Sequence, residues 1–249
     1  MIPTMPSSPS SQEIGRVLHE MRLAAFEPQG VEDLRAVRLD PPTPEQGAAP
    51  SFEFIPGQFL QVHAPSGEAS YFAIASAPGA RHYDLLVKRA NSCSKELFDL
   101  PIGAAVRVVG PQGKGFPLAS HAGRDVLLIG VGTGIAPLRS VLGWALARRA
   151  EFGRMILLHG VLTPRHRCYP DEFPAWRAAG ADARVTVTSA GDDASWDGPI
   201  GFVQDLLPAL DLNPARTVAC LVGMKEMVDA NTATLRAMGV PPDRILLNF

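Results

Sequence analysis

The apolar residues of this chain change their spacing near residue 120, and this change divides the sequence into two parts. Before it, short alternating stretches such as Phe59 to His63 and Tyr83 to Lys88 are separated by Pro-Gly and Ser-Gly pairs, a pattern typical of antiparallel strands. After it, strand-like apolar runs alternate with residues at helical spacing, beginning with Asp125 to Gly130 and the residues from Ile135 on. Regular alternation of strand and helix predicts βαβ units and a parallel sheet.

The predicted architecture is a small antiparallel barrel or sandwich followed by a parallel-sheet α/β domain. We expect a flexible tail over residues 1–15, a β domain over 16–120 and an α/β domain over 121–249. In the β domain a further strand is expected at Ser70 to Ala75. In the α/β domain the alternation continues through Met155 to His159, a helix near Glu172 to Ala179, Val185 to Thr188, Val203 to Leu210, Val218 to Val222, Lys225 to Met238 and Ile245 to Phe249.

Composition and charge exclude several classes of partner. Apolar residues make up 46% of the 249, enough for one large core or two small ones. The formal net charge is only -2, so neither nucleic acid nor a membrane surface is an expected partner. No window reaches the roughly 18 uninterrupted apolar residues of a membrane span, and the N-terminus lacks the basic and apolar segments of a signal peptide. We therefore expect a soluble cytoplasmic protein.

The cysteines and histidines predict neither a disulfide framework nor a metal site. Cys93, Cys168 and Cys220 are odd in number and far apart, which argues against disulfides, zinc sites and iron-sulfur clusters. His159, His166 and Cys168 form the only cluster, and its spacing favours a chance grouping over a ligand set. No GxSxG elbow or P-loop is present. Hydrolase and kinase chemistry are therefore not expected.

Three glycines, Gly130, Gly132 and Gly134, lie between the first predicted strand and helix of the α/β domain, in the run GVGTGIAPL. Glycine permits positive φ and lets amides approach a phosphate, and a helix N-terminus at about Ile135 offers unpaired N–H groups to an anion. The run differs from the Rossmann GxGxxG, because the third glycine comes one residue early and no acidic residue closes the second strand. It predicts an anion-binding turn, with a tight turn that binds nothing as the alternative.

Motifs in both parts of the chain resemble those of the ferredoxin-NADP reductase superfamily of flavin oxidoreductases. GVGTGIAPL (130–138) is similar to its GGTGIAPL signature, and VGMKEM (222–227) to its CGPxxM loop. YFAIASAP (71–78) resembles the flavin-contacting RxYS strand, and NSCS (91–94) the flavin-phosphate turn. Further similar segments are TPRHRCYPDEF (163–173), WDGPIGFV (196–203) and GPQGKGFPL (110–118). The resemblance covers residues 15–249 and implies a β-barrel FAD domain before an NAD(P)-binding domain.

This resemblance implies an FAD-dependent NAD(P)H oxidoreductase or electron-transfer subunit, in which hydride passes between stacked nicotinamide and flavin rings. Electrons would then pass to a separate acceptor, a small molecule or a redox protein. The alternative is a flavin- or nucleotide-binding regulatory module that keeps the fold without turnover. The residues implied to contact FAD or the nucleotide are Ser70, Tyr71, Phe72, Ala73, Ile74, Ala75, Ser76, Val87, Lys88, Asn91, Ser92, Cys93, Ser94, Gly130, Gly132, Thr133, Gly134, Ile135, Ala136, Gly160, Thr163, Ser189, Gly223, Met224, Met227 and Phe249.

On the flavin side the chain departs from the family pattern. The family's flavin-phosphate Arg falls on Ser70, and Lys88, Arg89 and Lys95 are candidate replacements. Because successive strand residues face opposite sides, at most one of Lys88 and Arg89 faces the flavin. The same argument gives Phe72 the flavin-contacting aromatic position, with a barrel-core role as the alternative.

The flavin-phosphate turn and two positions of the nucleotide side complete the comparison. Ser94 and the amides of Cys93 and Ser94 are expected to contact cofactor phosphate. The family's Cys and Arg of the nucleotide side fall on Val222 and Leu162, and their roles are not transferred.

The last residue of the chain is an aromatic one. Phe249 ends the last predicted strand, and ligands of open α/β sheets bind beyond the carboxyl ends of the strands. In the resembled family a terminal aromatic can cover one flavin face, so Phe249 is assigned to the catalytic centre, with a frayed or core-packed end as the alternative.

Asp192 and Asp193 lie where NADP-dependent relatives place a cation for the 2′-phosphate. Carboxylates there favour NADH over NADPH, unless Arg165 and Arg167 fold over the adenosine.

Overall fold

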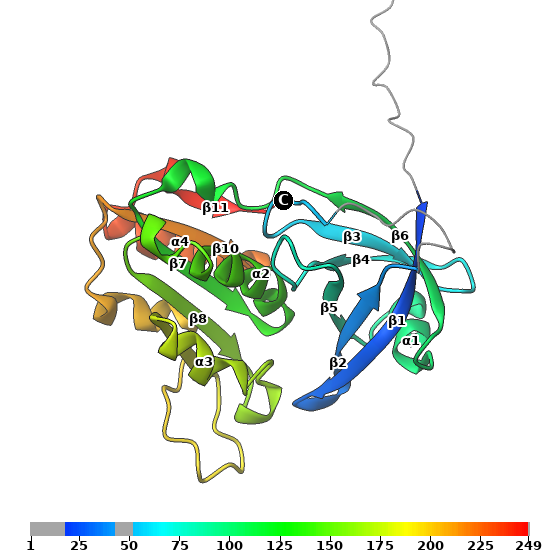
Figure 1. Ribbon diagram of the computed structural model, residues 1–249. Helices are drawn as coiled ribbons and strands as arrows, with labels where there is room; N and C mark the ends of the chain where they lie inside the picture. The colour runs from blue at the N-terminus through cyan, green and yellow to red at the C-terminus, as the bar shows by residue number, and fades with distance from the viewer. Residues whose placement is uncertain (1–17, 43–51, 249) are drawn as a thin grey trace, which may run out of the picture.

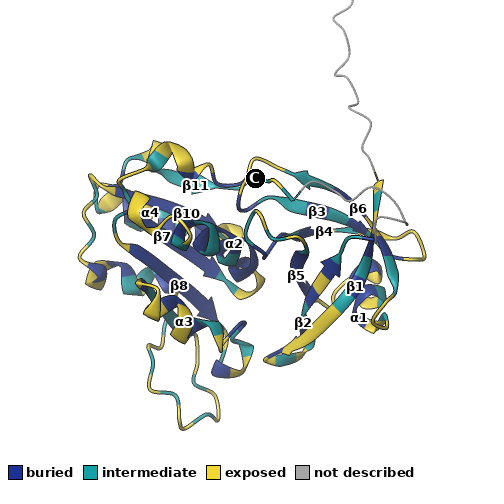
Figure 2. Cartoon of the chain, viewed as in Figure 1, coloured by how far each residue is buried: buried dark blue, intermediate teal, exposed yellow. Residues whose placement is uncertain are grey.

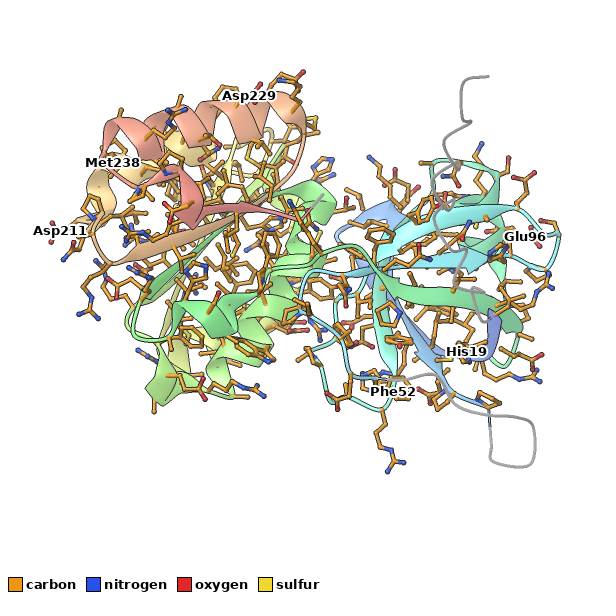
Figure 3. The ribbon with its side chains drawn as sticks, turned by 90° about the horizontal axis from the view of Figure 1, so that it is seen from above. His19, Phe52, Glu96, Asp211, Asp229 and Met238 are labelled. Atoms are coloured by element: carbon orange, nitrogen blue, oxygen red, sulfur yellow. The ribbon has the colours of Figure 1, made fainter. Side chains whose placement is uncertain are left out.

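The computed structural model describes residues 18–42 and 52–248. Two domains lie side by side, a barrel formed by the N-terminal half and an α/β domain formed by the C-terminal half (Figure 1). Seen from above, Glu96 and His19 lie on the barrel, and Met238 and Asp229 lie on the α/β domain (Figure 3). The tail expected over 1–15 lies outside the described residues. No helix in the described ranges is long and apolar enough to cross a membrane.

The first domain is a six-stranded antiparallel sheet that closes on itself. Its strand order is β4-β3-β6-β1-β2-β5, and a bridge between Ile74 and Leu85 joins the two ends. Closure leaves alternate side chains inside, such as Leu60 and Val62 of β3, which are completely buried. The prediction of an antiparallel β domain is confirmed, and closure makes it a barrel. Its elements are β1 Leu18–Gln29, β2 Val31–Asp40, β3 Phe59–His63, β4 Ala69–Ala73, β5 Tyr83–Lys88, α1 Ser92–Asp99 and β6 Ala105–Gln112.

The second domain is a five-stranded parallel sheet of order β11-β10-β7-β8-β9 with helices on both faces. The central strands β7 and β8 are apolar along nearly their whole length because both faces are covered (Figure 2). Side chains of α2 and α3 pack on one face, and those of α4 on the other. The elements are β7 Asp125–Val131, α2 Ile135–Leu146, β8 Met155–Val161, α3 Glu172–Ala178, β9 Ala181–Val187, β10 Thr217–Val222, α4 Lys225–Ala237 and β11 Ile245–Leu247. Short 3₁₀ turns connect them at Leu118–His121, Gly132–Gly134, Arg149–Glu151, Pro164–His166, Val203–Leu210 and Pro242–Arg244.

Two segments differ from their predicted form. Strand β9 begins at Ala181, four residues before the predicted Val185, because the small side chains of Ala181 and Ala183 pack into the core and give a weak apolar signal. The segment Val203–Leu210 is a 3₁₀ helix with Pro208 inside it, and proline lacks the N–H that a regular helix interior needs.

The two domains share one apolar core. Leu34, Leu86 and Phe116 of the barrel pack in the same buried cluster as α2 of the α/β domain. At the tip of the β1–β2 hairpin, the side-chain oxygen of Gln29 accepts a 2.6 Å hydrogen bond from the amide of Tyr169. Directly after β11, the side-chain amide of Asn248 donates to the carbonyl of Gly57 of the barrel at 3.1 Å. These contacts hold the domains against each other.

Candidate functional site

A cleft of about 1080 Å³ is lined by residues of both domains. Most of the sequence-predicted site residues border it, namely Ser70, Tyr71, Phe72, Ala73, Lys88, Asn91, Ser94, Gly132, Thr133, Gly134, Ala136, Gly160, Gly223, Met224 and Met227. The others do not line it: Ile74, Ala75, Ser76, Val87, Ser92, Cys93, Gly130, Ile135, Thr163 and Ser189. Phe249 lies outside the described residues, so the structure places no ring at the chain end.

On the barrel side, helix α1 begins with a capping box. The side chain of Asn91 accepts the amide of Ser94 at 2.9 Å, and the Ser94 hydroxyl accepts the amide of Asn91 at 2.9 Å. These partners engage the amide and hydroxyl of Ser94 in the cap, and the contact of Ser94 with a cofactor phosphate stays a prediction. The amides of Ser92 and Cys93 have no acceptor in the described part of the chain. A helix N-terminus with open amides suits an anion.

The Cys93 side chain belongs to the barrel core. It is 1% exposed, and its thiol donates to the carbonyl of Val62 at 3.4 Å. Burial raises the pKa of this thiol, so the neutral form predominates.

Ser70 stands where the family has its flavin-phosphate Arg, and three cations were considered as replacements. Of Lys88, Arg89 and Lys95, only Lys88 borders the cleft. Its ammonium lies 4.0 Å from the carboxylate of Asp33, which borders the cleft as well. Arg89 instead pairs with Asp99 at 2.7 Å and lies over the ring of Phe98. The alternation of strand residues therefore separates Lys88 from Arg89 as expected.

The two aromatic residues of β4 differ sharply in exposure. Phe72 is 8% exposed and packs in the barrel core, although it borders the cleft. Tyr71 is 58% exposed, and its ring meets that of Phe59 edge to face at 5.5 Å. The barrel-core role that was the alternative for Phe72 is therefore present in the structure. Whether Phe72 also contacts a flavin stays a prediction.

On the α/β side, the glycine turn Gly132–Gly134 continues directly into α2. The amide of Ile135 bonds back to the carbonyls of Gly132 and Thr133. The turn that borders the cleft therefore lies directly ahead of Ile135, at the N-terminal end of α2. Gly132 has φ +52°, in the left-handed region. A Cβ on Gly134 would lie 2.7 Å from the carbonyl oxygen of Val222, so only glycine fits there.

The side chain of His159 is hydrogen-bonded to the backbone of this turn. It is completely buried, and its Nε2 donates to the carbonyl of Gly132 at 3.0 Å, while Nδ1 has no partner. Burial lowers the pKa of His159 to about 4, so the ring is neutral near pH 7. His159 is thus a structural support for the turn. No group of three or more metal-ligating side chains occurs in the described segments.

The segment after β8 supplies the adjoining wall of the cleft. Leu162, the counterpart of the family Arg, is 63% exposed and borders the cleft. Thr163 does not line the cleft and bonds to Nδ1 of His166 at 2.9 Å, and His166 faces the cleft. Cys168 also borders the cleft, but burial raises its thiol pKa to about 12. This wall is therefore neutral apart from His166.

The loop after β10 closes the nucleotide side. Val222 and Gly223 border the cleft, while Cys220, two residues earlier, is completely buried. Burial raises the pKa of the Cys220 thiol, which excludes it as a nucleophile. A Cβ on Gly223 would meet the side chain of Met227 at 2.2 Å. Glycine here lets the loop approach α4 closely.

The acidic pair lies on an exposed loop beside two arginines. Asp193 accepts the amide of Ser195 at 3.0 Å, and its pKa is lowered by the bonds from Ser195 and by the charges of Arg167 and Arg165. Arg167 lies over the ring of Trp196 at 5.6 Å. The acidic loop and the arginine segment therefore face each other, and both kinds of charge are available at this position.

The cleft also contains residues that the sequence did not predict. Val31, Asp33 and Leu34 of the β1–β2 hairpin lie in no quoted motif, whereas Gly201, Phe202 and Val203 belong to the segment WDGPIGFV (196–203). A hydrophobic pattern shows which strand residues are apolar, but not which strands border the neighbouring domain. The unpredicted lining residues are Val31, Asp33, Leu34, Leu86, Ala90, Val131, Pro137, Val161, Leu162, His166, Cys168, Thr188, Gly201, Phe202, Val203, Gln204, Val222, Glu226 and Asn248.

Comparison with known proteins gives a consistent result. Residues 128–232 match the family model of the oxidoreductase NAD-binding domain. The chain is 33% identical to ferredoxin-NADP reductase B of Sorangium cellulosum over 199 residues, 77% of this chain and 78% of that protein. It is 29% identical to sulfhydrogenase 1 subunit gamma of Pyrococcus furiosus over 203 residues, 81% of this chain and 70% of that protein. The solved ferredoxin reductase in carbazole 1,9a-dioxygenase has a TM-score of 0.77 at 25% identity, covering 95% of this chain and 70% of that one.

Proposed function

This chain belongs to the ferredoxin-NADP reductase family of electron-transfer oxidoreductases, and we propose that it uses a bound FAD to take hydride from NADH and passes the electrons to a separate acceptor. One observation carries the proposal. A single cleft brings together the N-terminal end of α1 with Lys88 from one domain and the Gly132–Gly134 turn from the other. One cavity can therefore hold both cofactors in contact.

The barrel side of the cleft suits the phosphates of FAD. The open amides of Ser92 and Cys93 and the ammonium of Lys88 offer donors and a positive charge close to Asn91 and Ser70. Lys88 would replace the guanidinium that the family places at position 70. Its partner Asp33 lies 4.0 Å away and would compete with a phosphate for this charge. We therefore expect FAD to bind, and to bind with lower affinity than an Arg at position 70 would give.

The α/β side suits a nicotinamide dinucleotide. The Gly132–Gly134 turn and the N-terminal end of α2 border the cleft, and a helix N-terminus suits a pyrophosphate. Gly160 and Gly223 border the cleft without side chains at the ends of β8 and β10, so a ligand can approach the backbone closely. We propose that the nicotinamide lies between these loops and β4 of the barrel.

The residues of the cleft act by binding and alignment. FAD supplies the two-electron chemistry when it is bound, and the protein supplies orientation and exclusion of water. Among the described residues that border the cleft, the groups that carry or can acquire charge near neutral pH are Asp33, Lys88, His166 and Glu226. Hydride transfer between stacked rings requires no side chain to remove a proton, so the proposed reaction needs none of them as an acid or base.

Asp192 and Asp193 support NADH as the preferred donor. A 2′-phosphate near Asp193 would meet a fully exposed carboxylate, whereas a ribose hydroxyl would meet a hydrogen-bond acceptor. Arg165 and Arg167 act electrostatically on the carboxylate of Asp193. This carboxylate therefore offsets part of the positive charge that the two arginines would offer to a 2′-phosphate. A cytoplasmic location stays a prediction from the sequence.

The acceptor is proposed from the relatives. Their names describe the gamma subunit of a sulfhydrogenase and a ferredoxin reductase in a carbazole dioxygenase. We propose that this chain reduces a separate redox protein.

The test is the absorbance spectrum of the purified or FAD-reconstituted protein, followed by anaerobic addition of NADH. Bleaching of the flavin bands supports the proposal. A chain that binds flavin but is reduced by neither NADH nor NADPH would be the regulatory module instead. Release of FMN rather than FAD would contradict the cofactor assignment.

A further inference from the structure

Arg139 of α2 connects the two halves of the cleft. Its Nη1 donates to the carbonyl of Ala75 at 3.0 Å and to the carboxylate of Asp84 at 3.2 Å, and both acceptors belong to the barrel. Its Nε donates to both carboxylate oxygens of Glu172 at 2.9 Å, within its own domain. Its guanidinium also lies 4.9 Å from the centre of the Tyr169 ring. One side chain is therefore bonded to both domains at once.

Of the two barrel partners of Arg139, Ala75 follows strand β4, which borders the cleft, and Asp84 lies in β5. Ala75 is two residues beyond the end of β4, and its amide donates to the carbonyl of Asp84 at 2.7 Å. The hydroxyl of Ser76 accepts the amide of Asp84 at 3.1 Å and donates to the carbonyl of His82 at 3.2 Å. The segment that follows β4 is thus bonded to β5 through Ala75 and Ser76, and Arg139 donates to the Ala75 carbonyl.

Packing brings α2 against this strand end. A Cβ on Gly143, one turn after Arg139, would lie 3.2 Å from the Cβ of Ala77. Ala136, Ser140 and Gly143 recur at helical spacing with small side chains, a pattern that permits a close approach of backbones. Because α2 begins directly after the Gly132–Gly134 turn, a shift of α2 moves that turn as well.

The charges around Arg139 are balanced. Two carboxylates, Asp84 and Glu172, face the guanidinium, and Asp84 also pairs with Arg38 at 3.1 Å and lies 3.5 Å from His82. The side chain of Arg139 is only 21% exposed. Burial is the largest influence on the Arg139 pKa and acts to lower it, but the bond to Glu172 and the surrounding negative charges raise it overall. A neutral side chain at this position would leave two largely buried carboxylates without this partner.

We propose that Arg139 is a positioning residue that sets the distance between the flavin-binding strand end and the nucleotide-binding turn, and thereby aligns nicotinamide with flavin. The inference rests on the proposed function for its kinetic consequence, but not for the domain contact itself. Arg139 does not border the cleft and acts through the two elements it joins. A misplacement of about 1 Å between reacting groups can slow a reaction by roughly 10²-fold.

The test compares Arg139→Gln with Arg148→Gln, a control on the chain that follows α2. Arg148 is exposed and lies over the ring of Trp144 at 4.5 Å, away from the domain contact. The first readout is the rate of flavin reduction at saturating NADH, with the nicotinamide-to-flavin charge-transfer absorbance. For Arg139→Gln we expect a rate at least tenfold lower and a weaker charge-transfer band, with the Kd for NADH changed less than threefold. Arg139→Lys should recover part of the rate, because it keeps the charge but cannot hold all three acceptors.

The second readout needs no turnover. Hydrogen exchange should speed up at the amides of Ala75 and Asp84 and in residues 132–139 in Arg139→Gln, and remain unchanged in Arg148→Gln. Unchanged exchange in Arg139→Gln, or an unchanged reduction rate, would overturn the inference.

Two further outcomes are informative. If the wild-type protein is not reduced by NADH, the proposed function fails, while exchange still tests the contact. If Arg139→Gln does not fold, Asp84→Asn and Glu172→Gln each remove one side of the contact, and a normal exchange pattern in both would equally overturn it.

Discussion

Replacement of Gly132 by Val tests whether the turn after β7 binds nucleotide through its backbone. Gly132 has φ +52°, and a Cβ there would meet no protein atom within 4 Å. The cost is therefore conformational, roughly 1–2 kcal/mol for an L-residue in the left-handed region, and a β-branched side chain is an outlier there. A valine relieves this strain by leaving the left-handed region, which rotates the neighbouring amides.

The consequence for binding follows from those amides. An amide hydrogen bond to a charged phosphate contributes roughly 1.5–3 kcal/mol, so loss of one weakens NADH binding about 10- to 100-fold. FAD should stay bound, since its proposed donors belong to the barrel. The assay is anaerobic stopped-flow reduction over a range of NADH concentrations, with FAD occupancy measured from the absorbance spectrum.

Gly123 provides a matched control at the opposite end of the same strand. It has φ +78° and also no protein atom within 4 Å of a built Cβ. Gly123→Val should therefore lose a similar roughly 1–2 kcal/mol of stability while NADH reduces the flavin as in the wild type. Wild-type reduction kinetics in Gly132→Val would refute the reasoning. If Gly132→Val loses FAD as well, Gly132→Asn, which tolerates the left-handed region, separates a folding defect from a binding defect.

Three further predictions concern charge. Lys88→Ala should raise the Kd for FAD about tenfold, whereas Arg89→Ala, whose guanidinium is held by another partner, should leave it unchanged; equal effects in a flavin titration would contradict the assignment. Replacing Asp192 and Asp193 together by Asn should improve the ratio of kcat/KM for NADPH over NADH, and an unchanged ratio would exclude this loop from cofactor choice. Burial lowers the pKa of His159 to about 4 in the folded protein, from an ordinary value of 6.5. As pH falls below about 6.5, the unfolded chain therefore binds a proton before the folded one does. The free energy of unfolding should drop by about 3 kcal/mol between pH 7 and 4. Urea unfolding of His159→Gln should show a flatter dependence on pH than the wild type.

The glycine turn ahead of α2 was predictable because local sequence determines it. The glycine spacing of 130–134 depends on the backbone conformations of a few consecutive residues, whereas the segment NSCS (91–94) was identified only through the family resemblance. The same local character made the strands Phe59–His63 and Tyr83–Lys88 and the start of α2 at Ile135 predictable to the residue. Each of these features has a short-range physical cause, so no tertiary contact was needed to infer it.

Which polar groups remain open for a ligand was decided only by the fold. The sequence placed Ser94 in a phosphate-binding turn, but the folded chain uses its amide and hydroxyl within the capping box.

Among Lys88, Arg89 and Lys95, alternation along the strand left at most one of the first two facing the flavin and kept Lys95 as a third option. The folded chain brings Lys88 to the cleft, while Arg89 pairs with Asp99.

The domain contact lies furthest from what the sequence alone could determine. Arg139 follows the glycine motif in the chain, and nothing in its neighbourhood indicates Ala75 or Asp84, which are 64 and 55 residues away. The sequence alone determined the two domain types, their order and the glycine turn ahead of α2, because these depend on periodicity and local backbone preference. The tertiary structure decided which walls form the cleft and which side chain joins them, because such contacts arise only when residues far apart in the chain are packed together.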